Sequence, residues 1–136
     1  PVREESAQGI NSAIEGARTQ MTGPVVAILG DTPCITPAVL SMVIDEARKH
    51  PVSFVSDASG VGSTMWFAQP DTSERSHFGH HSRAEHRAHG AVELGAGEWS
   101  PQWARARRDV DTDVDLWDAL RLGLGAATLR VVDGRK

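Results

Sequence analysis

One short apolar run, VVAIL over residues 25–29, restricts the possible folds of this chain more than any other feature of its sequence. A run of this length, bounded by glycine and proline, is typical of a strand that is buried on both faces. The segment that follows has the pattern of a helix, with Thr36 in the capping position and Pro37 at the first helical position. A buried strand next to a well-capped helix predicts an α/β domain.

The rest of the chain alternates between helical and extended patterns. Ser82 and Glu85 form a capping-box pattern, and Gly90 follows the short helix that they would open. A glycine-bearing loop between two strand candidates gives the middle of the chain a hairpin-like character. We therefore expect an α/β fold with a mostly parallel sheet flanked by helices. The expected helices cover residues 5–20, 36–50, 82–89 and 113–122, and the expected strands cover residues 25–29, 52–57, 63–68, 91–94 and 107–110.

Length and charge limit the classes of function. The 136 residues suffice for one domain, and the net charge of −4 creates no field that favours nucleic acid or an anionic membrane. Cys34 is the only cysteine, which suits a cytoplasmic protein, and no apolar run is long enough to span a bilayer. The chain begins at Pro1, and its first residues resemble the interior of a longer sequence. We expect residues 1–136 to form a single domain that is incomplete at its N-terminus.

Three aspartates follow strand candidates at positions where α/β proteins bind ligands. Asp31 comes just after the apolar run, and Asp109 and Asp111 lie two residues apart at the end of a later strand candidate. Ligands bind outside the carboxyl ends of strands in such sheets, and residues two apart on a strand share a face. Clustered carboxylates repel one another unless a cation lies among them, and all-oxygen ligands suit Mg²⁺. The structural alternative is that Asp111 or Thr112 caps the next helix and Asp31 caps a turn.

Two further segments have features of anion-binding sites. DASGVGSTM, residues 57–65, combines glycines with the hydroxyls of Ser63 and Thr64, but it matches neither a Walker loop nor a dinucleotide fingerprint. Its structural alternative is a plain hairpin turn. Gly79 and Ser82 lie at a helix start, where backbone amides and the helix dipole favour a phosphate or a carboxylate. No G-x-S-x-G elbow surrounds either serine, so a serine hydrolase is not expected.

A histidine-rich segment, HFGHHSRAEHRAHG, precedes the fourth strand candidate. Imidazole clusters bind zinc or nickel, but no cysteine is nearby, and histidine pairs at helical spacing are also common on exposed faces. A transition-metal site therefore stays open as the alternative to an anion site at the helix start. The segment holds five of the six histidines, His77, His80, His81, His86 and His89.

Four motifs occur in a fixed order: GDTP, FVSDASGVGST, FGHHSRAEHRAHGAVEL and RRDVDTDVDL. In this order and with these gaps, the sequence closely resembles the 2-phospho-L-lactate or phosphoenolpyruvate guanylyltransferases of coenzyme F(420) biosynthesis. The resemblance runs over nearly the whole chain. It implies an α/β nucleotidyltransferase fold related to that of molybdopterin guanylyltransferases. It also implies a Mg²⁺-dependent enzyme that transfers GMP from GTP to the phosphate of a three-carbon phospho-acid and releases pyrophosphate.

Carried over motif by motif, the resemblance assigns roles to individual residues. The catalytic, metal-binding aspartates fall on Asp31, Asp109 and Asp111. The family usually has threonine where this chain has Ser63, so the hydroxyl is kept without the methyl group. The segment GINSAIEG resembles the nucleotide-side helix of the family. The implied phospho-acid site comprises Ser63, Gly79 and Ser82, and the implied nucleotide site comprises Gly9 and Asn11.

The sequence also departs from the family pattern. Members of the family begin with a strand and a Lys-x-Arg-Leu loop that binds the GTP phosphates, and this chain matches roughly the last two-thirds of the fold. The alternative function is a non-catalytic fragment or degenerate relative that binds the phospho-acid and the metal. The sequence around HRAHGAVEL resembles the branch of the family that favours phosphoenolpyruvate over 2-phospho-L-lactate as acceptor. The sequence leaves the oligomeric state open, a homo-oligomer included.

Overall fold

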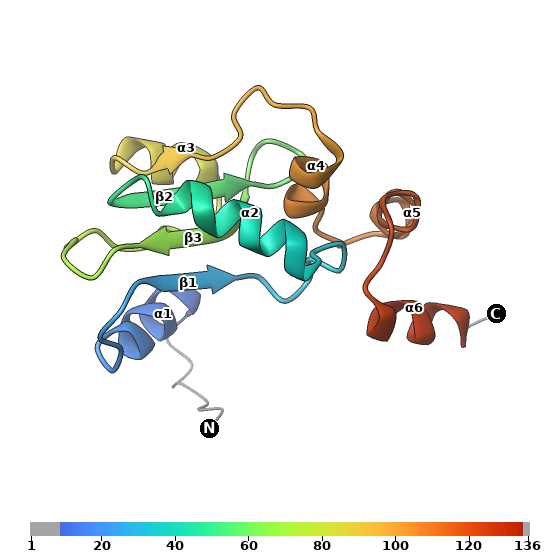
Figure 1. Ribbon diagram of the computed structural model, residues 1–136, viewed down its shortest axis with the longest axis horizontal. Helices are drawn as coiled ribbons and strands as arrows, with labels where there is room; N and C mark the ends of the chain where they lie inside the picture. Colours follow the sequence, from blue (N-terminus) through green and yellow to red (C-terminus); the bar gives the residue numbers. More distant parts are fainter. Residues whose placement is uncertain (1–8, 135–136) are drawn as a thin grey trace.

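The computed structural model describes residues 9–134 (Figure 1). Expected helix residues 5–8 lie outside this range. The elements within it are, in chain order, α1 (Ile10–Arg18), β1 (Val25–Ile28), α2 (Pro37–Ala47), β2 (Val52–Ser56), β3 (Ser63–Ala68), α3 (Ser82–Ala88), β4 (Val92–Glu93), α4 (Pro101–Arg107), α5 (Asp113–Leu122) and α6 (Ala126–Asp133).

The four strands form one mixed sheet in the order β1-β3-β2-β4. β3 is antiparallel to both β1 and β2, whereas β2 and β4 are parallel. The α/β class with flanking helices is confirmed, but the expectation of a mostly parallel sheet is wrong. The loop over residues 57–62 is too short for a crossover between parallel strands, so it turns the chain back as a hairpin.

Strands β1, β2 and β4 nevertheless run in the same direction, because β3 lies between β1 and β2 and reverses the direction twice. Their carboxyl ends consequently meet at one edge of the sheet, which we call the carboxyl edge. Asp31 follows β1, Asp57 follows β2, and Ser63 begins β3 at this same edge. The mixed sheet therefore keeps the property of a parallel sheet that concentrates ligand-binding groups at one end.

Helices cover both faces of the sheet (Figure 1). Alternate residues of β2 and β3 point to opposite faces, and each set packs against its own helices. The core beneath α2 and α4 consists of Val39, Val43, Ala47, Val55, Met65, Phe67, Leu94, Trp103 and Ala106. The core on the opposite face consists of Val52, Phe54, Trp66, Ala68, Phe78 and Ala91, with Ile14 of α1 packed against it.

Helix α4 was not expected from the sequence, and it packs through the buried indole of Trp103. Its cap is Ser100, whose Oγ accepts a hydrogen bond from the backbone N–H of Trp103 at 3.3 Å. The Trp103 ring lies against Gly95, where an added Cβ would lie 2.3 Å from Cδ2 of the indole. Arg107 donates to the Gly95 carbonyl oxygen and places its guanidinium 5.8 Å from the Trp103 ring centroid. Gly95 therefore lets the chain approach the ring closely.

Several expected elements are confirmed by their caps. Thr36 caps α2, where its Oγ1 accepts from the backbone N–H of Val39 at 3.2 Å. Helix α5 ends at Gly123, as expected from the sequence.

The thiol of Cys34 is buried against α5, where it donates to the Ala119 carbonyl oxygen at 3.4 Å. Burial raises the pKa of that thiol, so Cys34 is not suited to act as a nucleophile.

Other expectations are wrong at the level of single elements. Residues 107–110 are not a strand, since Arg107 ends α4, and the strand expected over 91–94 shortens to β4. The capping box at Ser82 is absent: the cap of α3 is His81, in a left-handed conformation with φ 56°, and it makes no side-chain cap bond. Helix α6 was not expected. Together with α5 it lies beyond one end of the sheet (Figure 1).

Strand β1 pairs only with β3 among the described residues, so its other edge is open. Val26 and Ile28 on β1 are 38% and 41% exposed.

Within residues 9–134, every helix is too short or too polar to span a bilayer.

Candidate functional site

Asp31, Asp109 and Asp111 lie together at the carboxyl edge. One carboxylate oxygen of each lies within 4.8 Å of the other two. The backbone N–H of Val110 donates to the carbonyl oxygen of Asp31 at 3.0 Å, which joins the segment after α4 to the turn after β1. Asp109 and Asp111 flank this attachment point. A single backbone hydrogen bond thus brings the three carboxylates together in place of the strand that was expected there.

Asp115 fixes the far side of this segment. Its Oδ2 accepts from the backbone N–H groups of Asp111 and Thr112, at 3.1 and 3.0 Å, and the Asp115 N–H donates to Thr112 Oγ1 at 3.2 Å. These bonds form the capping box of α5, with Thr112 as the cap. Arg108 pairs with Asp115 at 3.2 Å and stabilises the arrangement. Because Thr112 does the capping, the Asp111 carboxylate is left to face Asp31 and Asp109.

The electrostatics of this cluster favour a bound cation. Burial raises the pKa of the Asp109 carboxyl, and the negative charges of Asp57, Asp111 and Asp31 raise it further. Oδ1 of Asp31 is buried and has no hydrogen-bond partner. Crowded carboxylates with an unsatisfied buried oxygen are stabilised by a cation among them. The all-oxygen donor set of Asp31, Asp109 and Asp111 fits a hard ion such as Mg²⁺.

Asp57 is a fourth carboxylate at this edge, and it is not among the residues expected from the sequence. Its Oδ1 accepts from Ser59 Oγ at 2.8 Å and from the backbone N–H of Val61 at 3.1 Å. An added Cβ on Gly62 would lie 2.4 Å from Oδ2 of Asp57, so glycine allows the loop to close around this carboxylate. The signal was present in the sequence, since Asp57 follows β2 directly, much as Asp31 follows β1.

A pair of buried serines forms the second part of the site. Ser82 Oγ donates to Ser63 Oγ at 3.1 Å, and Ser63 Oγ lies 2.9 Å from Nδ1 of the buried His86. The backbone N–H of His77 donates to Nε2 of His86 at 2.8 Å, so Nε2 carries the lone pair and Nδ1 carries the proton. Ser63 Oγ then accepts from both neighbours. Its own proton is left to donate to a ligand.

A β-bulge turns Ser63 toward these partners. Val55 pairs with Met65 and Ser56 pairs with Ser63, so Thr64 is an extra residue on β3. Regular alternation would place Ser63 on the same face as Met65, beneath α2 and α4. The bulge reverses the alternation, so that Ser63 faces α3 while Thr64 Oγ1 donates to a carbonyl oxygen of α4 at 2.8 Å. The sequence contains no clear signal for this bulge.

His86 makes the stability of this site depend on pH. Burial lowers the pKa of His86 to about 4, and the neighbouring His77 and His89 contribute to the decrease. The unfolded chain, with an ordinary histidine pKa near 6.5, therefore binds a proton before the folded protein does as the pH falls. The contribution of neutral His86 to the free energy of unfolding is therefore complete above pH 6.5, and it is lost progressively as the pH falls to 4. The expected loss is about 3 kcal/mol, since one pKa unit corresponds to about 1.4 kcal/mol.

Urea denaturation in EDTA at pH 7.0 and pH 4.5 should show about 2 kcal/mol of this loss, because pH 4.5 still lies above the folded-state pKa of about 4. A His86→Gln variant should lose less stability than the wild type between the two pH values, because glutamine has no proton to bind. NMR of the wild type gives an independent check that does not require the variant to fold. A His86 imidazole that titrates near pH 6.5 in the native protein would contradict the expectation.

The remaining expected site residues lie nearby or form separate contacts. Gly79 adopts φ 131° three residues before Ser82, and nothing lies within 4 Å of the place where its Cβ would be. Asn11 on α1 is hydrogen-bonded to the segment that leads into Gly79: its Oδ1 accepts from Ser76 Oγ and Phe78 N–H, and its Nδ2 donates to the Phe78 carbonyl oxygen, all at 2.8–2.9 Å. Gly9 precedes α1 with φ 94°. The nucleotide-binding role of Gly9 and Asn11 stays a prediction.

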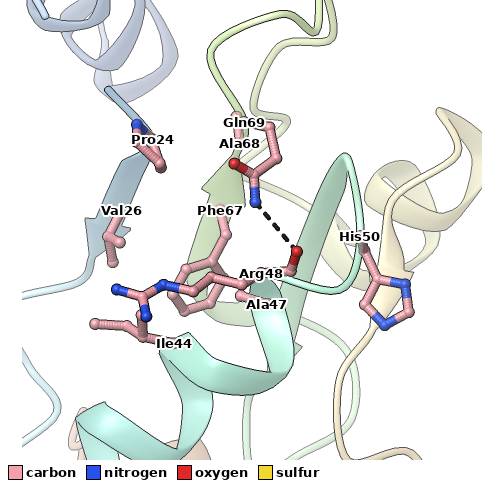
Figure 2. A pocket seen from close by; sticks show the side chains of 9 residues that line it. All are labelled: Pro24, Val26, Ile44, Ala47, Arg48, His50, Phe67, Ala68 and Gln69. Atoms are coloured by element: carbon pink, nitrogen blue, oxygen red, sulfur yellow. Dashed lines mark hydrogen bonds between the residues drawn. The ribbon is translucent and has the colours of Figure 1, made fainter. Parts of the chain in front are cut away.

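The surface has two hollows that bear on the location of the site, and only the first contains a carboxylate. A polar pocket of about 310 Å³ adjoins Asp57 and is also lined by Arg83, Glu93, Trp99 and Arg107. Asp57 is the carboxylate that relates this pocket to the cluster, because its negative charge contributes to the raised pKa of Asp109, whereas Asp31, Asp109 and Asp111 do not line the pocket. A second hollow, of about 250 Å³, lies between α2 and the strands β1 and β3 (Figure 2). No carboxylate lines it, so it does not form part of a cation site.

The fold and the site define an α/β protein with a carboxylate cluster and a buried serine pair near one edge of its sheet. No protein-family model matches the chain. The chain is 39% identical to a phosphoenolpyruvate guanylyltransferase of Streptomyces avermitilis over 93% of its own length, and 39% identical to one of Mycobacterium leprae over 97%. It spans about three-fifths of the length of these curated relatives, 59% and 60% respectively. The chain is therefore a relative of the phosphoenolpyruvate guanylyltransferases, and the family resemblance of its motifs is confirmed.

Proposed function

We propose that the chain provides the metal site and the acceptor site of a nucleotidyltransferase-like guanylyltransferase. The proposed reaction transfers GMP from GTP to the phosphate of phosphoenolpyruvate or 2-phospho-L-lactate, with release of pyrophosphate, in coenzyme F(420) biosynthesis. The observation that carries this proposal is the convergence of Asp31, Asp109 and Asp111 within 4.8 Å in a chain related to proteins named phosphoenolpyruvate guanylyltransferase.

The chemistry of this reaction suits the groups at the carboxyl edge. The acceptor phosphate is already an anionic nucleophile, so the site has to align the reactants and requires no general base. Asp31, Asp109 and Asp111 would hold Mg²⁺, whose chemistry is to neutralise charge on the α-phosphate and the leaving pyrophosphate. Ser63 would donate its remaining proton to a phosphate oxygen of the acceptor, since its lone pairs already accept from His86 and Ser82.

Other properties support small-molecule partners. The net charge of −4 disfavours nucleic acid and anionic membranes, and the single cysteine, buried as a thiol, suits a cytoplasmic location. Gly79, with its open left-handed backbone, would allow the acceptor to approach the chain closely.

Pyrophosphate release tests the proposal directly. The chain is incubated with Mg²⁺ and GTP, and phosphoenolpyruvate and 2-phospho-L-lactate are offered separately. Release that depends on one acceptor would support the proposal and identify that acceptor. A folded sample that releases no pyrophosphate but binds phosphoenolpyruvate in a Mg²⁺-dependent way would instead be a non-catalytic phospho-acid-binding module. Absence of both release and binding would overturn the proposal.

A further inference from the structure

The structure separates the five clustered histidines into distinct roles. His86 is buried and uses both ring nitrogens, one toward Ser63 and one toward the His77 backbone. His80 and His81 stack on each other, with ring centroids 5.5 Å apart. The third group lies on the outer side of α3, where one donor atom each of His77, Glu85 and His89 lies within 4.8 Å of the other two.

We propose that His77, Glu85 and His89 bind one divalent transition-metal ion of the Zn²⁺ type. Two imidazoles and one carboxylate form a donor set that zinc sites use, and three protein ligands leave a fourth position for water. This set differs from the all-oxygen cluster at the carboxyl edge, which suits a hard ion. The site therefore does not depend on the proposed transferase function.

Hydrogen bonding prepares His89 to act as a ligand. Nδ1 of His89 lies 2.9 Å from the backbone carbonyl oxygen of Glu85, and because a carbonyl only accepts, Nδ1 must carry the proton. The lone pair is then on Nε2. A ligating histidine commonly donates its other ring N–H to a backbone carbonyl, which orients the ring and makes the ligand more basic. The local α3 backbone thus supplies this support.

Glu85 and His77 complete the set from two sides. Glu85 lies one helical turn before His89, so their side chains lie on the same face of the helix. None of the ion pairs among the described residues involves Glu85, whereas its neighbour Arg87 pairs with Glu93 at 3.6 Å. His77 comes from the preceding loop, and its ring stacks on that of His89 with centroids 3.7 Å apart.

The backbone of His77 is held in place by the buried core. Its N–H donates to Nε2 of His86, which is inaccessible to solvent. The loop that carries His77 is therefore anchored before any metal arrives. A metal ion must lie near the plane of each imidazole that binds it, so the stacked rings of His77 and His89 have to tilt apart to reach metal–nitrogen distances of about 2.0–2.1 Å. The side chains of Glu85 and His89 are exposed, which leaves room for this rotation.

Calorimetric titration with Zn²⁺ tests the site. The whole chain is titrated in excess Mg²⁺, which occupies the all-oxygen cluster and leaves the histidine cluster available. We expect one zinc per chain. His89→Ala should weaken zinc binding at least about tenfold, and Glu85→Gln should weaken it by less, because glutamine keeps an oxygen but loses the charge. His50→Ala, which removes a histidine that follows α2 and lines the hollow of Figure 2, should leave the affinity unchanged.

Visible absorption with Co²⁺ as a second probe gives a spectroscopic readout, since a four-coordinate nitrogen and oxygen site should show d–d bands that His89→Ala removes. Circular dichroism confirms that each variant is folded. The proposal is overturned if the folded wild type binds no zinc, if His89→Ala binds zinc as tightly as the wild type, or if a His80→Ala variant loses zinc binding and His89→Ala does not. None of these readouts requires pyrophosphate release.

Discussion

Replacing Asp109 with asparagine should remove Mg²⁺ binding at the carboxyl edge and lower acceptor-dependent pyrophosphate release at least about 100-fold. Asparagine keeps the shape of the side chain but loses the negative charge of one of three clustered carboxylates. Mutating a residue that only hydrogen-bonds to a metal ligand typically costs 10–100-fold in metal affinity or activity. Losing the charge of a ligand itself should therefore lower the activity by at least the upper end of that range. The activity assay in saturating GTP and Mg²⁺ measures the effect.

The same variant has an opposite effect on stability when metal is absent. Because burial and neighbouring charges raise the pKa of Asp109, its ionised form destabilises the folded protein near pH 7. Asp109→Asn should therefore have a higher melting temperature than the wild type in EDTA, and Mg²⁺ should raise the melting temperature of the wild type only.

Asp45→Asn is the matched control for Asp109→Asn, because it makes the same change in charge at an exposed position on α2. It should leave both the melting temperature and the response to Mg²⁺ close to those of the wild type. An equal response to Mg²⁺ in Asp109→Asn and the wild type would show that these carboxylates do not form the cation site.

Replacing Gly95 with alanine should destabilise the protein by roughly 3 kcal/mol, from a steric clash and a strained backbone together. The new Cβ would lie 2.3 Å from the Trp103 ring, which is a buried part of the core beneath α2 and α4. Gly95 also has φ 65°, a conformation that an alanine adopts at a cost. Urea denaturation at pH 7 measures the difference in unfolding free energy.

Gly97 offers an unusually close control for this change. It has a similar left-handed φ of 76°, but nothing lies within 4 Å of the position of its Cβ. Gly97→Ala should therefore cost about 1 kcal/mol, from backbone strain alone. Equal costs at Gly95 and Gly97 would mean that the contact with Trp103 adds nothing.

The convergence of the candidate site residues at one end of the sheet could largely be predicted from the order of strands along the chain. The rule that ligands gather at carboxyl ends singles out Asp31 as a candidate, and Asp57 satisfies the same rule, because it follows β2 directly. The rule holds although β3 is antiparallel, because β1 and β2 both pair with β3 and therefore run in the same direction. The proximity of Asp109 to Asp31 was expected for the wrong reason, since a single backbone bond from Val110 replaces a strand.

What could not be predicted depends on contacts between residues distant in the sequence. Ser82 has the pattern of a capping residue, yet its hydroxyl bonds to Ser63 on β3, nineteen positions away. The tautomer of His86 is set by the backbone of His77, and the orientation of Ser63 is set by a bulge at Thr64. Local propensity contains no information about such partners. Helix α6 was missed for a related reason, since it contributes no buried residue to the core.

The four tryptophans are divided between the interior and the solvent, which gives the protein internal optical reporters. Trp66 and Trp103 are buried, whereas Trp99 is 94% exposed and Trp117 is also accessible. A dissolved ionic quencher such as iodide reaches only the exposed pair, so the emission that survives quenching comes from the core. Trp99 also lines the pocket beside Asp57. A molecule that occupies this pocket will shield one indole from iodide and leave Trp117 as the internal reference, so occupancy becomes visible without any label.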